Sequence, residues 1–186
     1  VYLDIVGMVP TSDEARKSLD DTDPKKREKL VDELLTRQES VEAWAMKWAD
    51  VLRVKSEFPI NLWPNAAQAY HRWIRDALRA NMPYDKFARA LLTASGSNFR
   101  EPPANFWRAV QGRTPDALAS AVALTFMGTR LETWPEARRA CLARFFSRVA
   151  YKKTAEWKEE IVVCDPAPAE ALETFLPDGT AVRVDP

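Results

Sequence analysis

Residues 64–92 read PNAAQAYHRWIRDALRANMPYDKFARALL, and this stretch decides the fold. In its first part apolar side chains recur at three- and four-residue spacing, which predicts a helix from Pro64 or Asn65 to about Asn81. Pro83 ends that helix, and Pro83-Tyr84-Asp85 is typical of a second helix start. The inward residues are Tyr70, Trp73, Ile74, Ala77 and Leu78, followed by Phe87, Leu91 and Leu92. The stretch therefore indicates a mainly helical protein.

Helix start signals extend this pattern toward the N-terminus. Thr11-Ser12-Asp13-Glu14 has the spacing of a capping box and predicts a short helix to about Leu19. Asp23-Pro24 offers an N-cap and a preset first residue for the next helix. A further helix is predicted from Ser40, with two tryptophans on one face.

The second half of the chain changes character near its end. Thr114-Pro115 predicts a helix that stops at Gly128, and Trp134-Pro135 predicts the start of the last helix. Beyond Tyr151 the run WKEEIVVC is rich in β-branched residues, and short extended pieces flank Pro177-Asp178-Gly179. A small β structure is therefore expected at the C-terminus.

These patterns predict a mainly α, irregular multi-helix domain of about seven or eight helices with a small β hairpin or sheet at the C-terminus. A length of 186 residues makes a single domain the default, with residues 1–150 as the helical body and residues 151–186 as the β-rich tail. The chain starts at Val1 within sequence that already reads as structured. We therefore expect a domain excised from a larger multi-domain protein.

Charge, hydropathy and cysteine content exclude several classes. Lys and Arg together number 27, as do Asp and Glu, and this zero net charge disfavours a nucleic-acid binder. No apolar run approaches the roughly 18–20 residues that span a bilayer, so direct membrane insertion is not expected. Cys141 and Cys164 lack CxxC or CxxCH spacing, so neither a zinc knuckle nor covalent haem is encoded, and no cofactor is expected. A disulfide between them and two free thiols both stay open.

The histidine and the tryptophans are the first candidate functional residues. His71, the sole histidine, lacks a second histidine or an HExxH motif, so a partly buried, hydrogen-bonded side chain is favoured over a catalyst or a metal ligand. Core spacing favours packing for most tryptophans over a platform that stacks sugars or bases. The packing set is Trp44, Trp48, Trp73 and Trp157. Trp63 and Trp107, in or beside loops, are the freer candidates.

The richest polar segment is SGSNFREPPANFWR at residues 95–108. It twice places an asparagine before an aromatic residue and an arginine, an arrangement that could grip a carboxylate, a sugar or a partner backbone. In the alternative interpretation the asparagines cap turns and the arginines pair with helix carboxylates. The candidate binding residues are Trp63, Asn65, His71, Asn98, Arg100, Asn105, Trp107 and Arg108.

Other polar groups favour structural roles. Asp50 and Arg53, three residues apart on a predicted helix beside Lys55, favour a salt bridge. Glu159-Glu160 is interpreted as a solvated surface turn, and no catalytic carboxylate pair is predicted. The sequence contains no GxSxG, Walker A or GxGxxG motif. No catalytic residue and no metal ligand is therefore proposed from sequence.

Several blocks resemble the domain of unknown function fifteen-forty-nine, also called the second planctomycete-type cytochrome domain. The blocks are YLDIVGMVPT, KLVDELL, AYHRWIRDALRANMPYDKFARALL, LTASGSNFR, PANFWRAV, LTFMGTRLE, TAEWKEEIVV and LPDGT. The resemblance runs from Val1 to about Pro186, and the MPYDKF and ASGSNFR blocks are its most specific parts. It implies a large exported, multi-domain protein, in the periplasm or at the cell surface, with a cytochrome c-like module upstream and an activity that is not established.

The resemblance departs from the family at one place. Many members carry a CxxCH haem motif just after the segment that matches FMGTRLE. Here residues 133–139 read TWPEARR, without cysteine or histidine. The chain is therefore expected to belong to a haem-free branch.

Two functional hypotheses follow. The first is a non-catalytic interaction or scaffold module of a larger exported protein, with Trp63 and the 98–108 loop as its contact surface and another domain of the parent chain or a protein as its partner. The second is part of a carbohydrate-active or redox enzyme whose site is completed by neighbouring domains, with a polysaccharide as the alternative partner. A haem or metal protein would need ligation by His71 and is not expected.

Overall fold

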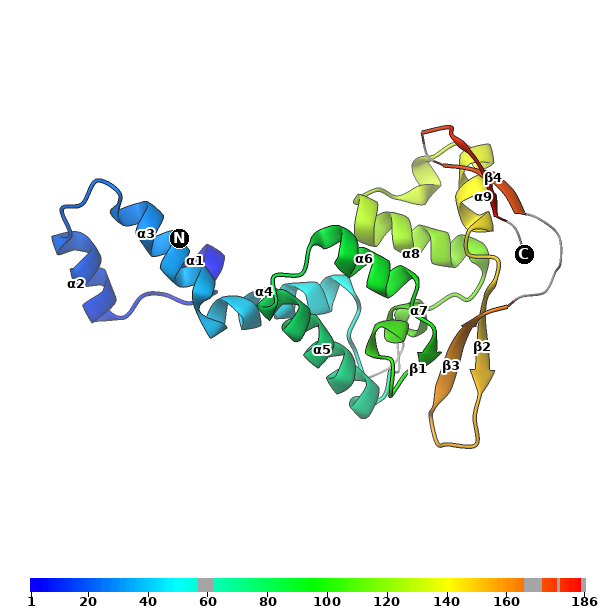
Figure 1. Ribbon diagram of the computed structural model, residues 1–186, viewed down its shortest axis with the longest axis horizontal. Helices are drawn as coiled ribbons and strands as arrows, with labels where there is room; N and C mark the ends of the chain where they lie inside the picture. The colour runs from blue at the N-terminus through cyan, green and yellow to red at the C-terminus, as the bar shows by residue number, and fades with distance from the viewer. Residues whose placement is uncertain (57–61, 166–171, 177, 185–186) are drawn as a thin grey trace. The chain divides into compact units, whose positions relative to one another are not determined.

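A computed structural model describes residues 1–56, 62–165, 172–176 and 178–184 of the chain (Figure 1). The chain divides into two compact units. Unit 1 contains Val1–Asp50 and His71–Met82, and unit 2 contains Val51–Tyr70 and Pro83–Pro186. Helix α5 (Pro64–Arg79) contributes its first turns to unit 2 and the rest to unit 1. The sequence predicts a single domain over residues 1–186, and this stays a prediction.

The predicted fold class is confirmed. The described residues form nine α-helices, two short 3-10 helices and five strands. Apart from the short strand β1 (Gly96–Ser97), the strands follow the last helix. Within the described ranges, no helix is both long enough and apolar enough to cross a bilayer. The protein is thus mainly helical, with small antiparallel sheets in its C-terminal half.

Unit 1 is built from four helices and the second part of α5. The four are α1 (Tyr2–Ile5), α2 (Ser12–Asp20), α3 (Lys26–Thr36) and α4 (Gln38–Val51). Helix α2 begins where the sequence predicts, because Thr11 and Glu14 form a capping box. The Thr11 hydroxyl accepts from the Glu14 N–H at 3.3 Å, and the Glu14 carboxylate accepts from the Thr11 N–H at 2.8 Å. Helix α1 packs against α3.

Two helix starts in unit 1 differ from the prediction. Asp23-Pro24 does not open α3, because Asp23 Oδ1 accepts from the Lys25 N–H at 2.8 Å and closes a turn before the helix. Helix α4 begins at Gln38 rather than Ser40, directly after α3 ends. The unit also leaves apolar side chains exposed, since Leu35 on α3 is 55% exposed.

Unit 2 holds the remaining helices. They are α6 (Tyr84–Leu92), η1 (Pro102–Ala104), α7 (Asn105–Ala109), α8 (Pro115–Met127), η2 (Leu131–Thr133) and α9 (Glu136–Arg144). The predicted cap of α8 is confirmed, because the Thr114 hydroxyl accepts from the Ala117 N–H at 3.3 Å. Gly128 ends α8 with φ 63°, a left-handed conformation that glycine adopts without a Cβ penalty.

The core of unit 2 fixes helix α7 in place. Small residues of α8 allow α9 to pack closely against it, in a cluster of Ala119, Ala123, Leu131, Leu142 and Ala143. The fully buried Phe106 ring on α7 lies 5.4 Å from Phe126, and the Trp107 ring lies 5.6 Å from Phe146. These aromatic contacts join α7 to the core, and α7 carries Arg108.

Two small antiparallel sheets complete unit 2. The strands are β2 (Val149–Lys153), β3 (Glu160–Cys164), β4 (Leu172–Phe175) and β5 (Ala181–Val184). Strand β3 lies between β1 and β2, with Val162 opposite Gly96 on one side and Tyr151 on the other (Figure 1). Strands β4 and β5 form a separate pair, which confirms the extended pieces predicted on either side of the 177–179 turn. Pro177 itself lies outside the described residues.

Two strand positions correct the sequence prediction. The β-rich part begins at Val149 rather than at Tyr151, because Val149 pairs with Cys164 at the end of the β2–β3 hairpin. Strand β1 lies inside the segment predicted to be only a loop, because the edge of β3 offers it backbone partners.

Candidate functional site

A buried ion cluster lies where β3 begins. Glu160, the first residue of β3, is 7% exposed. The Nε atom of Arg108, on α7, lies 3.1 Å from Glu160 Oε2. Arg113, in the loop before α8, donates from Nη1 to Oε1 at 2.8 Å and from Nη2 to Oε2 at 2.9 Å. Two guanidinium groups from one segment thus hold a single carboxylate from the sheet.

The electrostatics of this cluster keep Glu160 ionised. Burial, the largest single influence, raises the pKa of the Glu160 carboxyl, but the hydrogen bonds from Arg113 and Arg108 together outweigh it and lower the pKa overall. Two positive groups face one negative group, so the cluster keeps a net positive charge. The Arg113 side chain is 54% exposed, against 12% for Arg108, so the excess charge reaches solvent through Arg113.

The Tyr151 ring packs against the guanidinium of Arg113. The Arg113 guanidinium carbon lies 4.2 Å from the centre of the Tyr151 ring, within cation–π range. The Tyr151 hydroxyl donates to the Trp107 carbonyl oxygen at 3.1 Å. Burial raises the pKa of the Tyr151 phenol, so the ring stays neutral at ordinary pH. Arg113 therefore rests on a fixed aromatic surface.

Two buried asparagines fix the backbone at the start of β3. Asn98 Oδ1 accepts from the Glu160 N–H at 2.9 Å, and the Asn98 N–H donates to the Glu160 carbonyl at 3.1 Å. Asn105 Nδ2 donates to the carbonyl oxygens of Asn98 at 2.7 Å and Pro102 at 3.1 Å. Both side chains are fully buried. Both side chains therefore support the backbone from inside the protein, Asn105 by binding a nearby turn carbonyl and Asn98 by binding a distant strand.

The turn between β2 and β3 is held by a second carboxylate. Glu159 accepts from the Ser97 hydroxyl at 2.5 Å and from the Thr154 hydroxyl at 2.8 Å. These two hydrogen bonds, the Ser97 bond first, lower the pKa of the Glu159 carboxyl, and the charge of Arg100 adds to the effect. Glu159 therefore binds the turn both to Ser97 on β1 and to Thr154 within the turn itself.

This turn presents an exposed tryptophan and a lysine beside the partly buried Trp63. Trp157 is 72% exposed, and its ring lies 6.2 Å from that of Trp63 at an interplanar angle of 78°. The Nζ atom of Lys158 lies 5.4 Å from the Trp63 ring and 5.1 Å from the Trp157 ring. Trp63 has φ 74° and Lys158 has φ 62°, left-handed conformations that are uncommon outside glycine. We call Trp63, Trp157, Lys158 and Arg113 the aromatic–basic surface.

A hollow lies against this surface. Residues 153–160, together with Arg108 and Arg113, line an open cavity of about 460 Å³. The hollow is large enough for a few residues of a partner or for a sugar ring, and it carries both charge signs beside an indole face. The arrangement can therefore bind through stacking and charge-assisted hydrogen bonds.

The structure brings six of the eight predicted site residues together around β3 and the turn before it. The six are Trp63, Asn98, Arg100, Asn105, Trp107 and Arg108. Asn65 is exposed in the first turn of α5, and His71 lies in unit 1. The expected contact surface on the 98–108 loop needs correction, because Trp107 is 2% exposed and both asparagines are fully buried. The Arg108 guanidinium is also already paired, with the carboxylate of Glu160 on a strand and not with a helix carboxylate as predicted.

Sequence reasoning missed several members of the site. Glu160 is buried instead of solvated. Its two arginine partners lie 47 and 52 residues earlier in the chain, so the local sequence does not reveal the ion cluster. The packing predicted for Trp157 and Trp44 is wrong, since they are 72% and 42% exposed. The polar neighbours in TAEWKEE were the signal that Trp157 lies on a turn.

The predicted Asp50–Arg53 helix pair is also wrong. Helix α4 ends at Val51, and Arg53 has φ 58°, so the two side chains do not share a helical face. The Arg53 guanidinium instead donates to the Thr125 hydroxyl at 3.3 Å.

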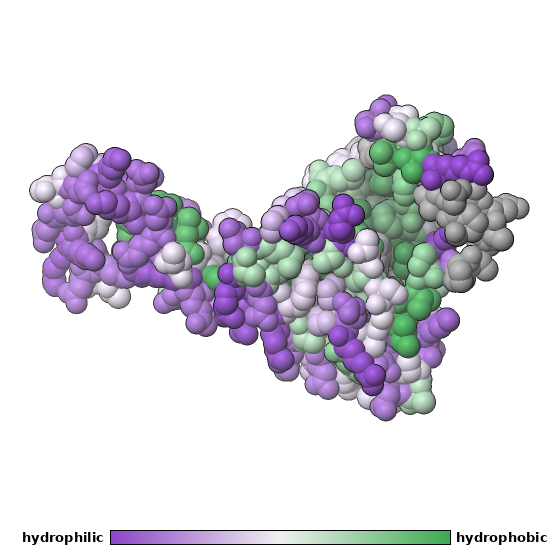
Figure 2. Space-filling view, in the orientation of Figure 1, coloured by the Kyte–Doolittle hydropathy of each residue, from purple (hydrophilic) through white to green (hydrophobic). Residues whose placement is uncertain are grey.

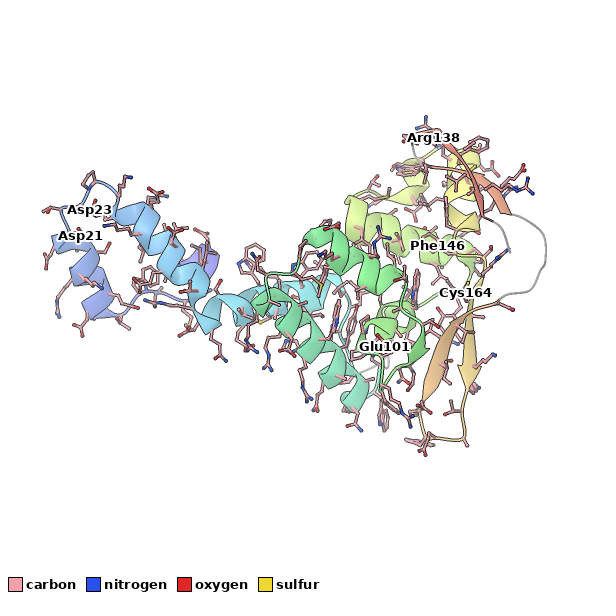
Figure 3. The ribbon with its side chains drawn as sticks, in the orientation of Figure 1. Asp21, Asp23, Glu101, Arg138, Phe146 and Cys164 are labelled. Carbon is pink, nitrogen blue, oxygen red and sulfur yellow. The ribbon has the colours of Figure 1, made fainter. Side chains whose placement is uncertain are left out.

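Among the described residues, the cysteines and the other residue types that bind metals form no common centre. Cys141 and Cys164 are both free thiols, and Cys164 lies at the end of β3 far from the 153–159 turn (Figure 3). Over the described ranges, no three His, Cys, Asp or Glu side chains converge in a way that would hold a metal ion.

Comparison with known families gives one finding. The sequence model of PSCyt2, described as a protein of unknown function (DUF1549), matches residues 1–138. The match ends within α9, whereas the resemblance drawn from sequence blocks extends to about Pro186. The curated proteins and the solved structures contain no significant match to the chain. Because the match covers well over half of the residues, the chain belongs to the PSCyt2 family.

Proposed function

We propose that this member of the PSCyt2 family is a non-catalytic interaction module of a larger exported protein, and that the aromatic–basic surface is its contact surface. The partner is another domain of the parent chain or a separate protein. The single observation that carries the proposal is the 72% exposure of Trp157 on a turn whose backbone is held from both sides. Tryptophan and arginine are the residues most enriched among those that dominate binding energy at interfaces.

The rigidity of the surface supports a binding role. Glu159 fixes the turn through two hydroxyl hydrogen bonds, and Asn98 fixes the first residue of β3. Left-handed backbone at Trp63 and Lys158 costs about 1–3 kcal/mol each, and such strain concentrates at functional sites. A surface that is already ordered loses less entropy on binding.

The state of the carboxylates supports a non-catalytic role. A general acid or base works best with a pKa near the operating pH. Glu159 and Glu160 both have lowered pKa values and both are engaged in fixed hydrogen bonds. Neither is poised to exchange a proton with a substrate near neutral pH.

Export and the lack of haem rest on the family and on the sequence. The family name refers to a cytochrome-type domain, and the resemblance implies an exported parent. The chain has two cysteines, at positions that form no CxxCH motif, and residues 133–139 contain neither cysteine nor histidine. A haem-free module beside a cytochrome domain is consistent with both observations.

A second candidate is contact with carbohydrate as part of an enzyme completed by neighbouring domains. The observation that favours it is the exposed indole of Trp157 beside the polar hollow of about 460 Å³. A sugar ring could stack on the indole while charged side chains bind its hydroxyl or carboxylate groups.

The test compares matched tryptophan and lysine pairs. Trp157→Ala/Lys158→Ala removes the centre of the proposed surface. Trp44→Ala/Lys47→Ala removes a similar exposed pair on α4, where Lys47 Nζ lies 4.3 Å from the Trp44 ring. Each variant and the unaltered chain would be titrated by calorimetry against the separately produced remainder of the parent protein. We expect the Trp157 variant to bind on the order of 30-fold more weakly and the Trp44 variant to bind normally.

Equal binding by both variants would contradict the proposal. A parallel titration with neutral and acidic oligosaccharides, followed by tryptophan fluorescence, separates the two candidates. Saccharide binding that Trp157→Ala abolishes, without any binding of the remainder of the parent protein, would replace the first candidate with the second.

A further inference from the structure

A groove in unit 1 is lined by apolar side chains and acidic groups. Its lining comes from the segment after α1, from α4 and from the start of the unit 1 part of α5, and its volume is about 680 Å³. Val6, 4% exposed, forms part of the lining, and Met8 and Met46 are 51% and 65% exposed.

The wall beside Val6 is backbone held tightly against α4. Gly7 has φ 73°, and a Cβ atom at this position would lie 3.3 Å from the Ala43 Cβ. The chain therefore approaches α4 more closely than a side chain would comfortably allow. This fixed wall contrasts with the two methionines, whose flexible thioether side chains adapt to the shape of an apolar partner.

The lining along α4 has a helical repeat. Gln38, Glu39, Glu42, Ala43 and Met46 lie at spacings of one, three or four residues, which places them on one stripe of the helix. From residue 38 to residue 46 the stripe is about 12 Å long, at 1.5 Å of rise per residue. That length suits about two turns of a partner helix with apolar residues one turn apart.

The charges of the groove select the partner. The lining contains two acidic side chains, Glu39 and Glu42, and the side chain of His71. Glu42 is 3.6 Å from Arg75, whereas the ion pairs found among the described residues do not include Glu39. The groove therefore offers apolar contact next to uncompensated negative charge, which favours positively charged partners and disfavours acidic ones.

Exposed apolar residues continue beyond the groove. Leu3 and Val9, which flank the lining segment 6–8 in the sequence, are 63% and 73% exposed. In Figure 2 hydrophobic residues gather on the surface where α1 lies in Figure 1. Monomeric proteins seldom leave contiguous apolar patches of this kind without a binding role.

We propose that the unit 1 groove binds a cationic amphipathic helix from a partner protein. Two apolar side chains of that helix contact Met8 and Met46, and a lysine or arginine next to them pairs with Glu39. This inference is independent of the aromatic–basic surface, which lies in unit 2.

The experiment uses the full chain and a designed probe. The probe is a labelled, alanine-based helical peptide of about 15 residues, with leucines at i, i+3 and i+7 and lysines on the flanks. A second peptide has glutamate in place of every lysine. Fluorescence anisotropy would give the dissociation constant of each peptide for the chain and its variants.

We expect the lysine peptide to bind at least about tenfold more tightly than the glutamate peptide. Met8→Gln/Met46→Gln should weaken lysine-peptide binding by about tenfold or more, because it removes the apolar contact and keeps the charge. Glu39→Lys should weaken the lysine peptide and strengthen the glutamate peptide. The matched control Leu19→Gln/Leu35→Gln changes two exposed apolar residues outside the groove lining and should bind as the unaltered chain.

Three results would overturn the proposal. The first is equal affinity for the two peptides, and the second is unchanged binding by the Met8/Met46 variant with a normal melting temperature. The third is self-association of the chain, detected by sedimentation, that Met8→Gln/Met46→Gln abolishes and the lysine peptide does not compete with. That last result would assign the groove to a second copy of the chain.

Discussion

Replacing Glu160 with glutamine should lower the free energy of unfolding by about 2–4 kcal/mol. Glutamine keeps the size of the side chain but removes the charge that holds Arg108 and Arg113. Breaking a buried ion pair by removing one partner costs about 3–5 kcal/mol, because the other charge stays buried without compensation. That cost applies in full to Arg108, whose side chain is 12% exposed.

The contribution of Arg113 is smaller than its two short hydrogen bonds suggest. Its side chain is 54% exposed, so water solvates the guanidinium once the carboxylate charge is lost. Exposed ion pairs contribute about 0–1 kcal/mol, and the glutamine carbonyl still accepts one hydrogen bond. These two corrections place the expected loss below the upper end of the buried-pair range.

Urea unfolding followed by circular dichroism at neutral pH measures this loss. The midpoint of Glu160→Gln should fall while the slope stays constant. Glu156→Gln, an exposed change in the same turn, is the matched control and should stay within about 0.5 kcal/mol of the unaltered chain. Arg113→Ala should cost about 1 kcal/mol or less. A loss below about 0.5 kcal/mol for Glu160→Gln would refute the argument that the buried cluster is a main tie between α7 and the sheet.

Three further predictions concern the pH dependence of stability, the glycine that ends α8 and the exposed Trp157. Because the pKa of Glu160 is lowered on folding, its stabilising effect is fully present above its unfolded pKa of about 4.3 and is lost as the pH falls through the folded value. The urea midpoint should therefore drop as the pH falls below about 5, with a shallower drop in Glu160→Gln. Gly128→Ala should cost about 1 kcal/mol in thermal unfolding, and Gly128→Asn should cost less, because φ is 63° and no atom within 4 Å obstructs a Cβ. An equal cost for both would contradict the backbone explanation. Trp157→Ala should change the free energy of unfolding by less than about 0.5 kcal/mol, since the side chain is 72% exposed. A larger loss would show that the indole packs in the core.

The elements that the sequence predicts well are those set by local chemistry. Helix α2 follows from the Thr11 capping box, and α8 follows from Thr114-Pro115 and Gly128, since each signal acts within a few residues. Helices α5 and α6 follow from apolar spacing on either side of Pro83. Asp23-Pro24 shows the limit of such signals, because the same side chain can close a turn instead of capping a helix.

The site depends on contacts that local patterns do not encode. Asn98 binds Glu160 across 62 residues of sequence, and Arg113 reaches the same carboxylate across 47. The sequence predicts Asn98 and Arg108 as binding residues. Their bonds to Glu160 on β3 show that they support the surface from inside instead of forming it. Core spacing predicts packing for Trp157, but its position on a turn between two strands places it in solvent.

The central claim is that the aromatic–basic surface contacts the rest of the parent protein, and oxidative footprinting tests it most directly. Hydroxyl radicals modify exposed indoles, and mass spectrometry reports the modification rate at each tryptophan. Trp157 and Trp44 are both exposed in this chain, at 72% and 42%. The account predicts that Trp157 is protected in the intact parent protein relative to the isolated chain, while Trp44 is modified at the same rate in both. Unchanged modification of Trp157 in the parent protein would contradict contact with another domain of the parent chain, the first of the two proposed partners.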